Sequence, residues 1–201
     1  VGGLAVLAAR SVGYTSAGTV EFLLDTDGRF YFMEMNTRIQ VEHTVTEAIT
    51  GVDLVEEQIR IAAGHRLEVR QGDVKIDGHA IEVRINAEDP DAGFKPDPGE
   101  IDVLFVPDPP PGVVVRWDSA ARAGDRVSPH YDSLIGKLIV HAADRARAVA
   151  GARETLNGMR IEGVCTTLAL HRRIVADPEF ASGTYDVDFL TRPGRVGSGR
   201  A

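Results

Sequence analysis

Apolar and polar positions recur with two different periods along the first 64 residues. Residues 4–12 (LAVLAARSV) carry leucine and valine at helical spacing, which predicts an N-terminal helix. The runs 18–24 (GTVEFLL) and 29–35 (RFYFMEM) are rich in β-branched and aromatic residues. An Asp-Gly pair at 27–28 lies between these two runs, and this combination predicts a β-hairpin.

Two helix-start signals follow the hairpin. A Thr-x-x-Glu sequence begins at Thr44 and an Asp-x-x-Glu sequence begins at Asp53, and both are typical capping boxes. The second signal leads into residues 54–63 (LVEEQIRIAA), whose apolar positions have helical spacing. Gly64 is a suitable residue to end that helix.

Residues 70–140 have the pattern of strands separated by proline-rich turns, and residues 144–190 have the pattern of helices. We expect four strands, at 80–86, 101–106, 113–117 and 134–141. Two helices are expected at 144–156 and 167–176. The Gly- and Arg-rich end of the chain, 191–201, is expected to be a disordered tail.

Composition narrows the class of protein. The chain has 201 residues, with 22 Lys and Arg against 30 Asp and Glu, and its formal net charge is −8. An acidic balance without a basic face argues against binding to nucleic acid. No run of about 18 apolar residues occurs, so no membrane span is expected. The single cysteine, Cys165, excludes an internal disulfide and favours a reducing compartment, the cytoplasm or the mitochondrial matrix.

The first nine residues, VGGLAVLAA, enter the helical pattern without a preceding Met, basic segment or capping residue. A signal peptide is therefore not expected. We interpret the chain as a fragment whose upstream part is missing, and the alternative is a frayed native terminus.

The densest polar cluster is the segment 33–43, MEMNTRIQVEH. With a strand period of two, its even positions would place five hydrogen-bonding side chains on one face. These side chains are Glu34, Asn36, Arg38, Gln40 and Glu42. We expect the regular strand to extend only from Arg29 to Asn36.

The hairpin places another carboxylate near this cluster. A two-residue turn at 27–28 would put Glu21 directly opposite Glu34, and a four-residue loop at 25–28 would put the two diagonally. Both even loops keep the carboxylates on one face within about 5–8 Å, whereas a three-residue loop would separate them. Facing carboxylates repel each other unless positive charge lies between them, and Mg²⁺ with an oxygen from Asn36 would supply it.

Spacing alone leaves other interpretations of this cluster open. Alternating polar residues on a strand often form a solvated face, here an ion-pair ladder of Arg38, Gln40 and Glu42 with Glu34. Paired carboxylates also occur in other metalloenzymes and in retaining glycosidases.

A resemblance to a known family adds to this picture. Residues 32–46, FMEMNTRIQVEHTVT, closely resemble the segment that carries the active site in biotin carboxylases of the ATP-grasp superfamily. The similarity covers nearly the whole chain from Gly18 to Leu190. It is carried further by the segments 48–64, 78–90 (GHAIEVRINAEDP), 112–118 (GVVVRWD) and 129–140 (PHYDSLIGKLIV).

The resemblance implies an α+β fold. Residues 1–64 would end an ATP-grasp domain, and residues 65–190 would form a C-terminal domain of antiparallel sheet and helices. The implied function is ATP- and bicarbonate-dependent carboxylation of biotin through carboxyphosphate, as part of a ligase. The ligase would be an acetyl-, propionyl- or methylcrotonyl-CoA carboxylase, the first acting in fatty acid biosynthesis, or a pyruvate carboxylase.

The resemblance also implies roles for the polar residues of the nucleotide side. Glu21, Glu34 and Asn36 would hold the Mg²⁺ (or Mn²⁺) ions that bridge the ATP phosphates. Val187 matches a position near the adenine, but Asp188 departs from the family because a histidine can occur there. That departure puts the nucleotide role of Val187 in doubt.

The other implied roles concern bicarbonate and biotin. Arg38 would bind bicarbonate, with Gln40 and the backbone of Val41 beside it, and Glu42 would be the general base. Arg84 would stabilise the biotin enolate. Without the resemblance, the simpler interpretation of Arg84 is an ion pair with Glu82, because both lie on one face of the expected strand 80–86.

Partners follow from the same resemblance. Biotin would come from a carrier protein or domain, since no Met-Lys-Met sequence occurs, and a carboxyltransferase subunit would use the product. Arg116 would lie near the interface of a homodimer. Residues 1–201 also contain no Gly-rich phosphate loop, so we expect this chain alone to be inactive.

Two other functions stay open from the sequence. The chain could be a non-catalytic module that binds a carboxylase through the region of Arg116. It could also belong to another ATP-grasp ligase, such as a carbamoyl phosphate synthetase.

Overall fold

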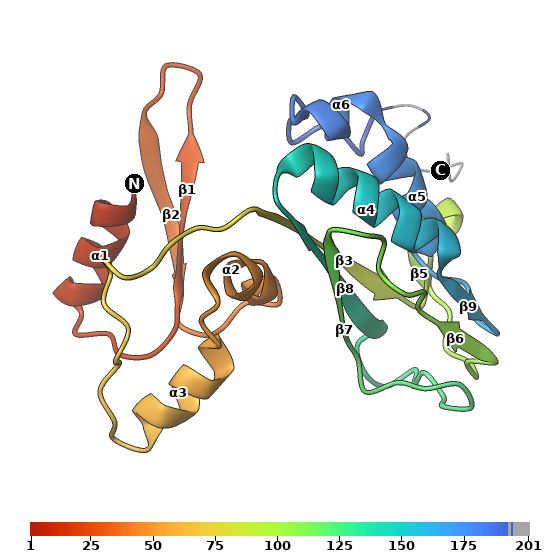
Figure 1. Cartoon of the computed structure of the whole chain (residues 1–201), viewed down its shortest axis with the longest axis horizontal. Helices are drawn as coiled ribbons and strands as arrows, with labels where there is room; N and C mark the ends of the chain where they lie inside the picture. The colour runs from red at the N-terminus through yellow and green to blue at the C-terminus, as the bar shows by residue number, and fades with distance from the viewer. Residues whose placement is uncertain (193, 195–201) are drawn as a thin grey trace. The chain divides into compact units, whose positions relative to one another are not determined.

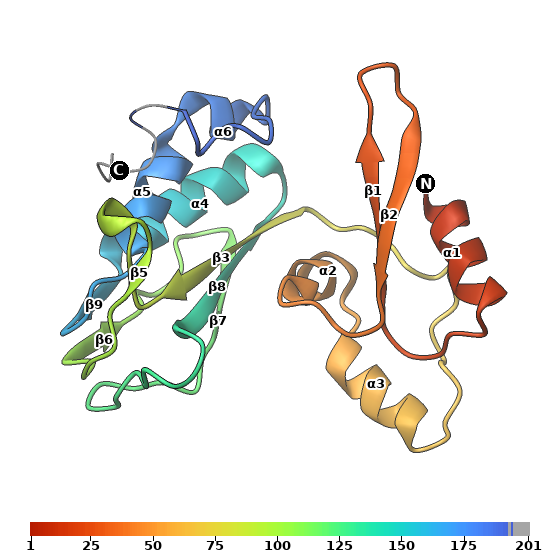
Figure 2. The same ribbon diagram turned by 180° about the vertical axis from the view of Figure 1, so that it is seen from behind.

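The computed structural model describes residues 1–192 and 194, and the chain divides into two compact units (Figure 1). The first unit is Val1–Ile76 and the second is Asp77–Ala201. Residues 65–77, between the last helix of one unit and the first strand of the other, form neither helix nor strand (Figure 2). The division thus falls after residue 76, whereas the sequence placed the domain boundary at Gly64.

The first unit consists of a β-hairpin and three helices. The predicted hairpin and helices are confirmed, and the fold is the α+β arrangement expected. The elements of the first unit, in chain order, are α1 Gly2–Ser11, β1 Thr19–Leu24, β2 Phe30–Asn36, α2 His43–Thr50 and α3 Leu54–Ala62.

The hairpin register differs from both expected alternatives. Leu24 pairs with Phe30, so the loop holds the five residues 25–29 and is odd in length. The register then shifts between Glu21 and Phe22, which leaves Met33 as an extra residue on β2. Glu21 therefore lies opposite Glu34 as expected, but a β-bulge and not an even loop brings the two together.

One of the two predicted capping boxes is wrong. Helix α3 begins as expected, because the side chain of Asp53 accepts a hydrogen bond from the backbone N–H of Glu56. Helix α2, however, begins at His43 with Glu42 as its N-cap residue, so Thr44 lies inside the first turn. Thr44 is fully buried there, and its position inside the helix excludes the predicted cap.

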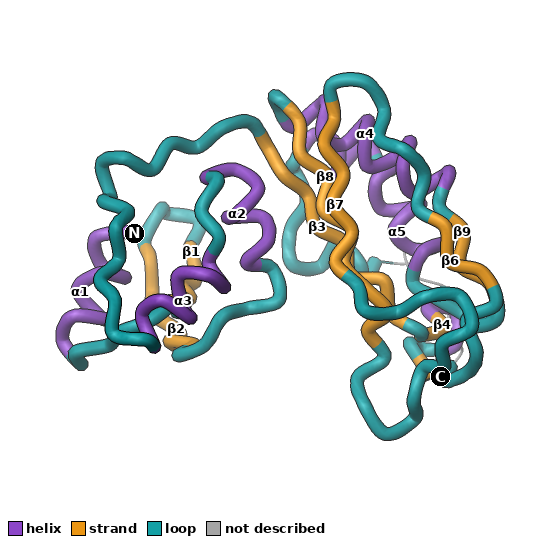
Figure 3. Tube along the Cα trace, turned by 60° about the horizontal axis from the view of Figure 1, so that its bottom comes forward, coloured by secondary structure: helices purple, strands orange, loops and turns teal. Residues whose placement is uncertain are grey.

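The second unit is built on a three-stranded antiparallel sheet with the strand order β3-β8-β7. Figure 3 shows the three strands side by side, with helices α4 and α5 against them. The bounds are β3 His79–Asn86, β7 Val113–Asp118, β8 Leu134–Ala142, α4 Arg145–Gly158 and α5 Leu168–Ala176. These elements match the predicted strands and helices to within two residues.

Several short elements of the second unit are absent from the sequence prediction, because two to five residues give no clear periodic pattern. They are β4 Glu88–Asp89, the 3₁₀ turn Pro90–Ala92, β5 Lys95–Pro96, β9 Arg160–Glu162 and helix α6 Pro178–Ser182. Strand β6, Val103–Phe105, is a shortened form of the strand expected at 101–106 and pairs with β9.

The two faces of the three-stranded sheet differ in character. One face joins the main hydrophobic core, together with the apolar side of α4. That face presents Ile81, Ile85, Leu138, Val140 and Val113. The opposite face carries charged side chains, because Arg84 pairs across the sheet with Lys137, and Lys137 pairs with Asp118.

Burial is distributed unequally between the two units. Within the described part of the chain, every buried apolar residue lies between Ala80 and Phe189. The buried residues of the first unit are the polar Thr44 and Glu47. Large apolar side chains of its hairpin are instead exposed, among them Leu23, Leu24, Phe30, Phe32 and Met33.

The predicted disordered tail begins in an ordered part of the structure. Arg192 donates hydrogen bonds of 2.6 Å to both Glu179 and Asp186, and these bonds hold it against α6. Of the rest of that predicted tail, Gly194 is described, and residues 193 and 195–201 lie outside the described residues. No helix among residues 1–192 is both long and apolar enough to cross a membrane.

Candidate functional site

Two carboxylates and two amides form the first part of the candidate site. Glu21 and Glu34 face each other across the hairpin. The Nδ2 of Asn36 donates to Glu21 at 2.7 Å and to Glu34 at 3.4 Å. The Nε2 of Gln40 donates to the same oxygen of Glu21 at 3.0 Å. Amide N–H groups thus supply the partial positive charge that two adjacent carboxylates need.

Arg38 is linked to this network through Asn36. Its guanidinium donates to the Oδ1 of Asn36 at 3.3 Å and to the backbone oxygen of Ile39 at 3.2 Å. Asn36 therefore has its oxygen toward the arginine and its nitrogen toward the carboxylates. One amide joins the predicted metal side of the site to the predicted bicarbonate side.

Three predicted side chains line one pocket of the first unit. Arg38, Gln40 and Glu42 surround a space of about 510 Å³, together with Gly18 and His43. Val41, predicted to contribute its backbone, lies between Gln40 and Glu42 in the same segment. A guanidinium, an amide and a carboxylate around one pocket can bind a small planar anion and accept a proton from it.

Two residues that the sequence did not assign to the site support its loop. The Nδ1 of His43 lies 2.7 Å from the backbone oxygen of Gln40, and because a carbonyl only accepts, the imidazole donates there. Gly18 lies close to Asn36, since a Cβ at this position would come within 3.1 Å of the Asn36 carbonyl oxygen. A side chain at residue 18 would therefore press against the Asn36 carbonyl and the ring of Tyr14, which would have to give way slightly.

Arg84 belongs to the second unit and lies on β3. Its guanidinium Nε is 3.8 Å from the carboxylate of Glu82, so the ion pair considered in the sequence analysis is present. The Arg84 side chain is 48% exposed, whereas the Glu82 side chain is 5% exposed. Arg84 and Val187 line the same pocket of about 460 Å³, whose other lining residues are mostly apolar.

The backbone of Arg84 has two partners that no sequence pattern indicates. Its carbonyl oxygen accepts from the Oγ1 of Thr167 at 3.1 Å and lies 2.8 Å from the Nε2 of His171. Burial lowers the pKa of His171 below its ordinary value, and the bond to this carbonyl opposes that shift in part. The neutral ring then carries its proton on Nε2.

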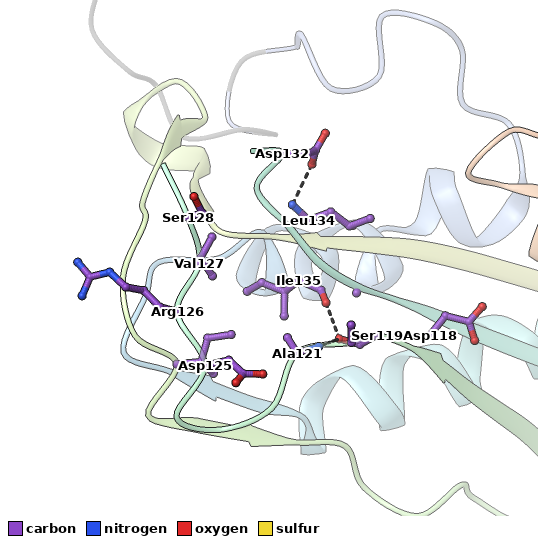
Figure 4. A pocket seen from close by; sticks show the side chains of 13 residues that line it. Asp118, Ser119, Ala121, Asp125, Arg126, Val127, Ser128, Asp132, Leu134 and Ile135 are labelled. Atoms are coloured by element: carbon purple, nitrogen blue, oxygen red, sulfur yellow. Dashed lines mark hydrogen bonds between the residues drawn. The ribbon is translucent and has the colours of Figure 1, made fainter. Parts of the chain in front are cut away.

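Arg116 lies on β7 and is exposed. Its guanidinium binds the carboxylate of Asp118 through two hydrogen bonds of 2.7 Å each. Asp118 in turn lines a third pocket, which Figure 4 shows between the start of β8 and the loop 119–133. In that pocket Ser119 donates to the backbone oxygen of Ile135, and Asp132 accepts from the backbone N–H of Leu134.

Comparison with known families assigns both parts of the chain. Residues 82–192 match the biotin carboxylase C-terminal domain, and residues 1–70 match the ATP-binding domain of the carbamoyl-phosphate synthase L chain. The first match covers more than half of the chain. The chain therefore belongs to the biotin carboxylase family, as the resemblance of its polar segment implied.

Individual relatives agree with this assignment. The chain is 53% identical over 190 residues to a biotin carboxylase of Nostoc sp., covering 94% of this chain and 42% of that protein. It is 47% identical over 190 residues to the α subunit of the mitochondrial methylcrotonoyl-CoA carboxylase of Rattus norvegicus, covering 94% and 26% respectively.

A solved structure shows the same fold. It is the biotin carboxylase domain dimer of the 2-oxoglutarate carboxylase of Hydrogenobacter thermophilus, in complex with MgADP, ADP and bicarbonate. The TM-score is 0.89 with 49% sequence identity, and the match covers 94% of this chain and 41% of that one. The chain thus spans about two-fifths of the length of this domain and of the Nostoc enzyme.

Proposed function

We propose that the protein carrying this chain is a ligase that carboxylates biotin with ATP and bicarbonate, through carboxyphosphate. The observation that carries the proposal is the pocket lined by Arg38, Gln40 and Glu42. A paired carboxylate site, Glu21 and Glu34, is joined to this pocket by Asn36. Membership of the biotin carboxylase family gives this combination its specific chemical meaning.

The carboxylate pair fits a magnesium ion. Mg²⁺ in phosphoryl-transfer sites takes one or two carboxylates together with substrate phosphates, and Glu21 and Glu34 supply the carboxylates on adjacent strands. Glu21 accepts hydrogen bonds from the side-chain amides of Asn36 and Gln40, so its carboxylate already faces groups of partial positive charge. Glu21 and Glu34 would hold Mg²⁺ or Mn²⁺ through their carboxylates, and the bound ion would neutralise the ATP phosphates. Asn36 would add its side-chain oxygen once its amide group turns over, because its nitrogen faces the two carboxylates in this structure.

Bicarbonate would occupy the pocket of the first unit. A guanidinium matches a planar oxyanion through parallel hydrogen bonds, which suits Arg38 to this ligand. Gln40 and the Val41 backbone would orient the anion. Glu42 would remove its proton, because a carboxylate within hydrogen-bond reach of that proton acts as a general base. The deprotonated anion would then attack the γ-phosphorus of ATP, the bond from that phosphorus to the β,γ-bridging oxygen would break, and ADP would leave as carboxyphosphate forms.

Arg84 would act in the second half of the reaction. Removal of a proton from the ureido group of biotin places negative charge on the ureido oxygen, and a fixed guanidinium compensates that charge. The half-exposed side chain of Arg84 is accessible to a biotin delivered from outside the chain. The low exposure of Glu82 keeps a carboxylate beneath the guanidinium and away from solvent.

Partners and cellular context complete the proposal. A carrier protein or domain would bring biotin, and a carboxyltransferase would pass the carboxyl group to an acyl-CoA or to pyruvate. The exposed Arg116 would lie near the interface of a homodimer. Val187 would lie near the nucleotide, and a reducing compartment would suit the free thiol of Cys165.

The test is carboxyl transfer by the native protein that carries this chain. With ¹⁴C-bicarbonate, ATP and Mg²⁺, it should cleave ATP only when bicarbonate is present and should label added biotin. Formation of carbamoyl phosphate from an ammonia donor, without any response to biotin, would instead assign the protein to the synthetase class. Binding of a carboxylase subunit without ATP cleavage would favour a non-catalytic module.

A further inference from the structure

Strand β3 lies at the edge of its sheet. Part of its exposed backbone forms hydrogen bonds with Thr167 and His171, which are distant in the sequence. The sheet order is β3-β8-β7, so β3 has one strand neighbour within the described residues. On its other side, the Oγ1 of Thr167 accepts from the backbone N–H of Asn86 at 3.0 Å and donates to the carbonyl of Arg84 at 3.1 Å. The backbone of Thr167 also donates to the carbonyl of Asn86 at 3.0 Å.

His171 adds a second donor to the same carbonyl. It lies one helical turn after Thr167, on α5, and its Nε2 is 2.8 Å from the Arg84 oxygen. Because residues four apart share one face of a helix, both donors reach β3 from one side. The carbonyl of Arg84 thus receives two hydrogen bonds. Arg84 and His171 also line one pocket.

We propose that His171, assisted by Thr167, is a positioning residue that fixes the direction in which Arg84 presents its guanidinium to substrate. The inference rests on the proposed role of Arg84 in biotin carboxylation. An edge strand without partners frays, and a fraying β3 would let the Arg84 side chain leave its catalytic orientation. Displacement of a charge-stabilising group by about 1 Å can cost on the order of 100-fold in rate.

The position of His171 suits this task and not proton transfer. Its Nε2–H is used by the Arg84 carbonyl, and burial lowers its pKa, so the ring is a neutral donor near pH 7. The charged groups that line the pocket with it are Glu82, Arg84 and Asp186. A neutral donor holds the backbone without adding charge beside the guanidinium.

The experiment compares two reactions of the native protein that carries this chain. One is bicarbonate-dependent ATP cleavage without biotin, and the other is carboxylation of added biotin. Arg84→Gln is the reference variant, which should lower biotin carboxylation selectively. His171→Leu removes the imidazole donor, whereas His171→Gln retains an N–H donor on a side chain of similar reach. Thr167→Val removes the hydroxyl donor independently.

A matched control is available for the threonine variant. Thr155 is 1% exposed on α4, and its hydroxyl has no hydrogen-bond partner among the described residues. Thr155→Val therefore removes a buried hydroxyl of the same second unit that makes no hydrogen bond to β3. It should leave both reactions at their normal rates.

The expected result is a selective loss with rescue. His171→Leu should lower the rate of biotin carboxylation by roughly 10- to 100-fold while ATP cleavage without biotin stays within about twofold of normal. His171→Gln should recover most of the loss, and Thr167→Val should show a smaller selective loss. Normal biotin carboxylation in His171→Leu, or equal loss in the Leu and Gln variants, would overturn the positioning role.

Two further outcomes separate this inference from the function on which it rests. If Arg84→Gln lowers both reactions equally, the proposed role of Arg84 fails. If Arg84→Gln is selective but Thr167→Val and His171→Leu are not, only the positioning role fails. Should His171→Leu prove unstable, ¹⁵N NMR of the unmodified chain decides independently, because the inference requires a proton on Nε2 at pH 7 and a proton on Nδ1 alone would contradict it.

Discussion

Glu21 and Glu34 lie directly opposite each other although the loop between their strands has an odd number of residues. The bulge at Met33 makes up for the odd loop, because one extra residue on β2 shifts the pairing by one position. Without the bulge, the side chain of Glu34 would project from the other face of the hairpin. The bulge therefore decides whether the two carboxylates form a pair.

This pairing predicts a binding site for a divalent cation on the chain itself. Mn²⁺, a paramagnetic substitute for Mg²⁺, should broaden the NMR signal of the Asn36 side-chain amide before signals of the second unit. Glu34→Gln removes one carboxylate of the pair and should weaken Mn²⁺ binding roughly tenfold, about 1.4 kcal/mol.

Asp27→Asn is the matched control for the cation site. Asp27 lies on the same hairpin but in its loop, where it binds Arg29. The Asp27→Asn variant should leave the midpoint of the Mn²⁺ titration unchanged. An equal loss of affinity in Asp27→Asn and Glu34→Gln would mean that the hairpin binds cations only through its general negative charge.

The same hairpin shows how far sequence reasoning can go. The period-two pattern of residues 29–36 was sufficient to predict the strand and the face that Glu34 and Asn36 share. The bulge was not predictable, since nothing in a single sequence marks Met33 as unpaired. The predicted helix cap at Thr44 was wrong because the fold buries Thr44 inside α2. This burial outweighed the preference of threonine for the start of a helix.

Contacts between distant residues were beyond the sequence altogether. Thr167 and His171 are 83 and 87 residues from Arg84, and neither has a motif that would connect it to that arginine. The polar segment 33–43 was accessible because its residues are neighbours in the chain. Only the fold brings the supporting residues of Arg84 to β3.

The distribution of burial predicts which leucines matter for stability. Leu138 is fully buried on β8, so Leu138→Ala should lower the free energy of unfolding by about 2–5 kcal/mol. Leu24 is 63% exposed on β1, and Leu24→Ala should change it by no more than about 0.5 kcal/mol. Urea unfolding followed by the fluorescence of Trp117, the only tryptophan, measures the Leu138 variant, and far-ultraviolet circular dichroism, which reports on both units, measures the Leu24 variant. Equal losses would contradict the placement of the core.

Hydrogen exchange should distinguish the two units within one sample. The first unit has no buried apolar side chain among its described residues, whereas the second contains the hydrophobic core. Amides of β1 and β2 should therefore exchange faster than those of β8 in the isolated chain. Slower exchange in the hairpin than in β8 would show that the first unit is stabilised by something other than apolar burial.

Two histidines should make the second unit less stable in acid. Burial lowers the pKa of His79, with a further decrease caused by the charge of Arg145, and burial also lowers that of His171. The unfolded chain then binds more protons than the folded chain below about pH 6.5. Stability should be complete above that pH and should fall as the pH drops through the folded-state pKa values.

Urea unfolding between pH 7.5 and pH 5 tests this dependence, again through Trp117. The double variant His79→Gln/His171→Gln should show a smaller decrease over the same interval than the unmodified chain. Identical pH profiles would mean that other groups cause the loss of stability.

The most direct test of the account concerns Glu42. In the native protein that carries this chain, Glu42→Gln should lower bicarbonate-dependent ATP cleavage by about 10²- to 10⁴-fold, the usual contribution of a general base. The melting temperature should not change, and Glu56→Gln, at an exposed carboxylate on α3, should keep normal activity. Near-normal ATP cleavage in the folded Glu42→Gln variant would contradict the assignment of the pocket to bicarbonate chemistry.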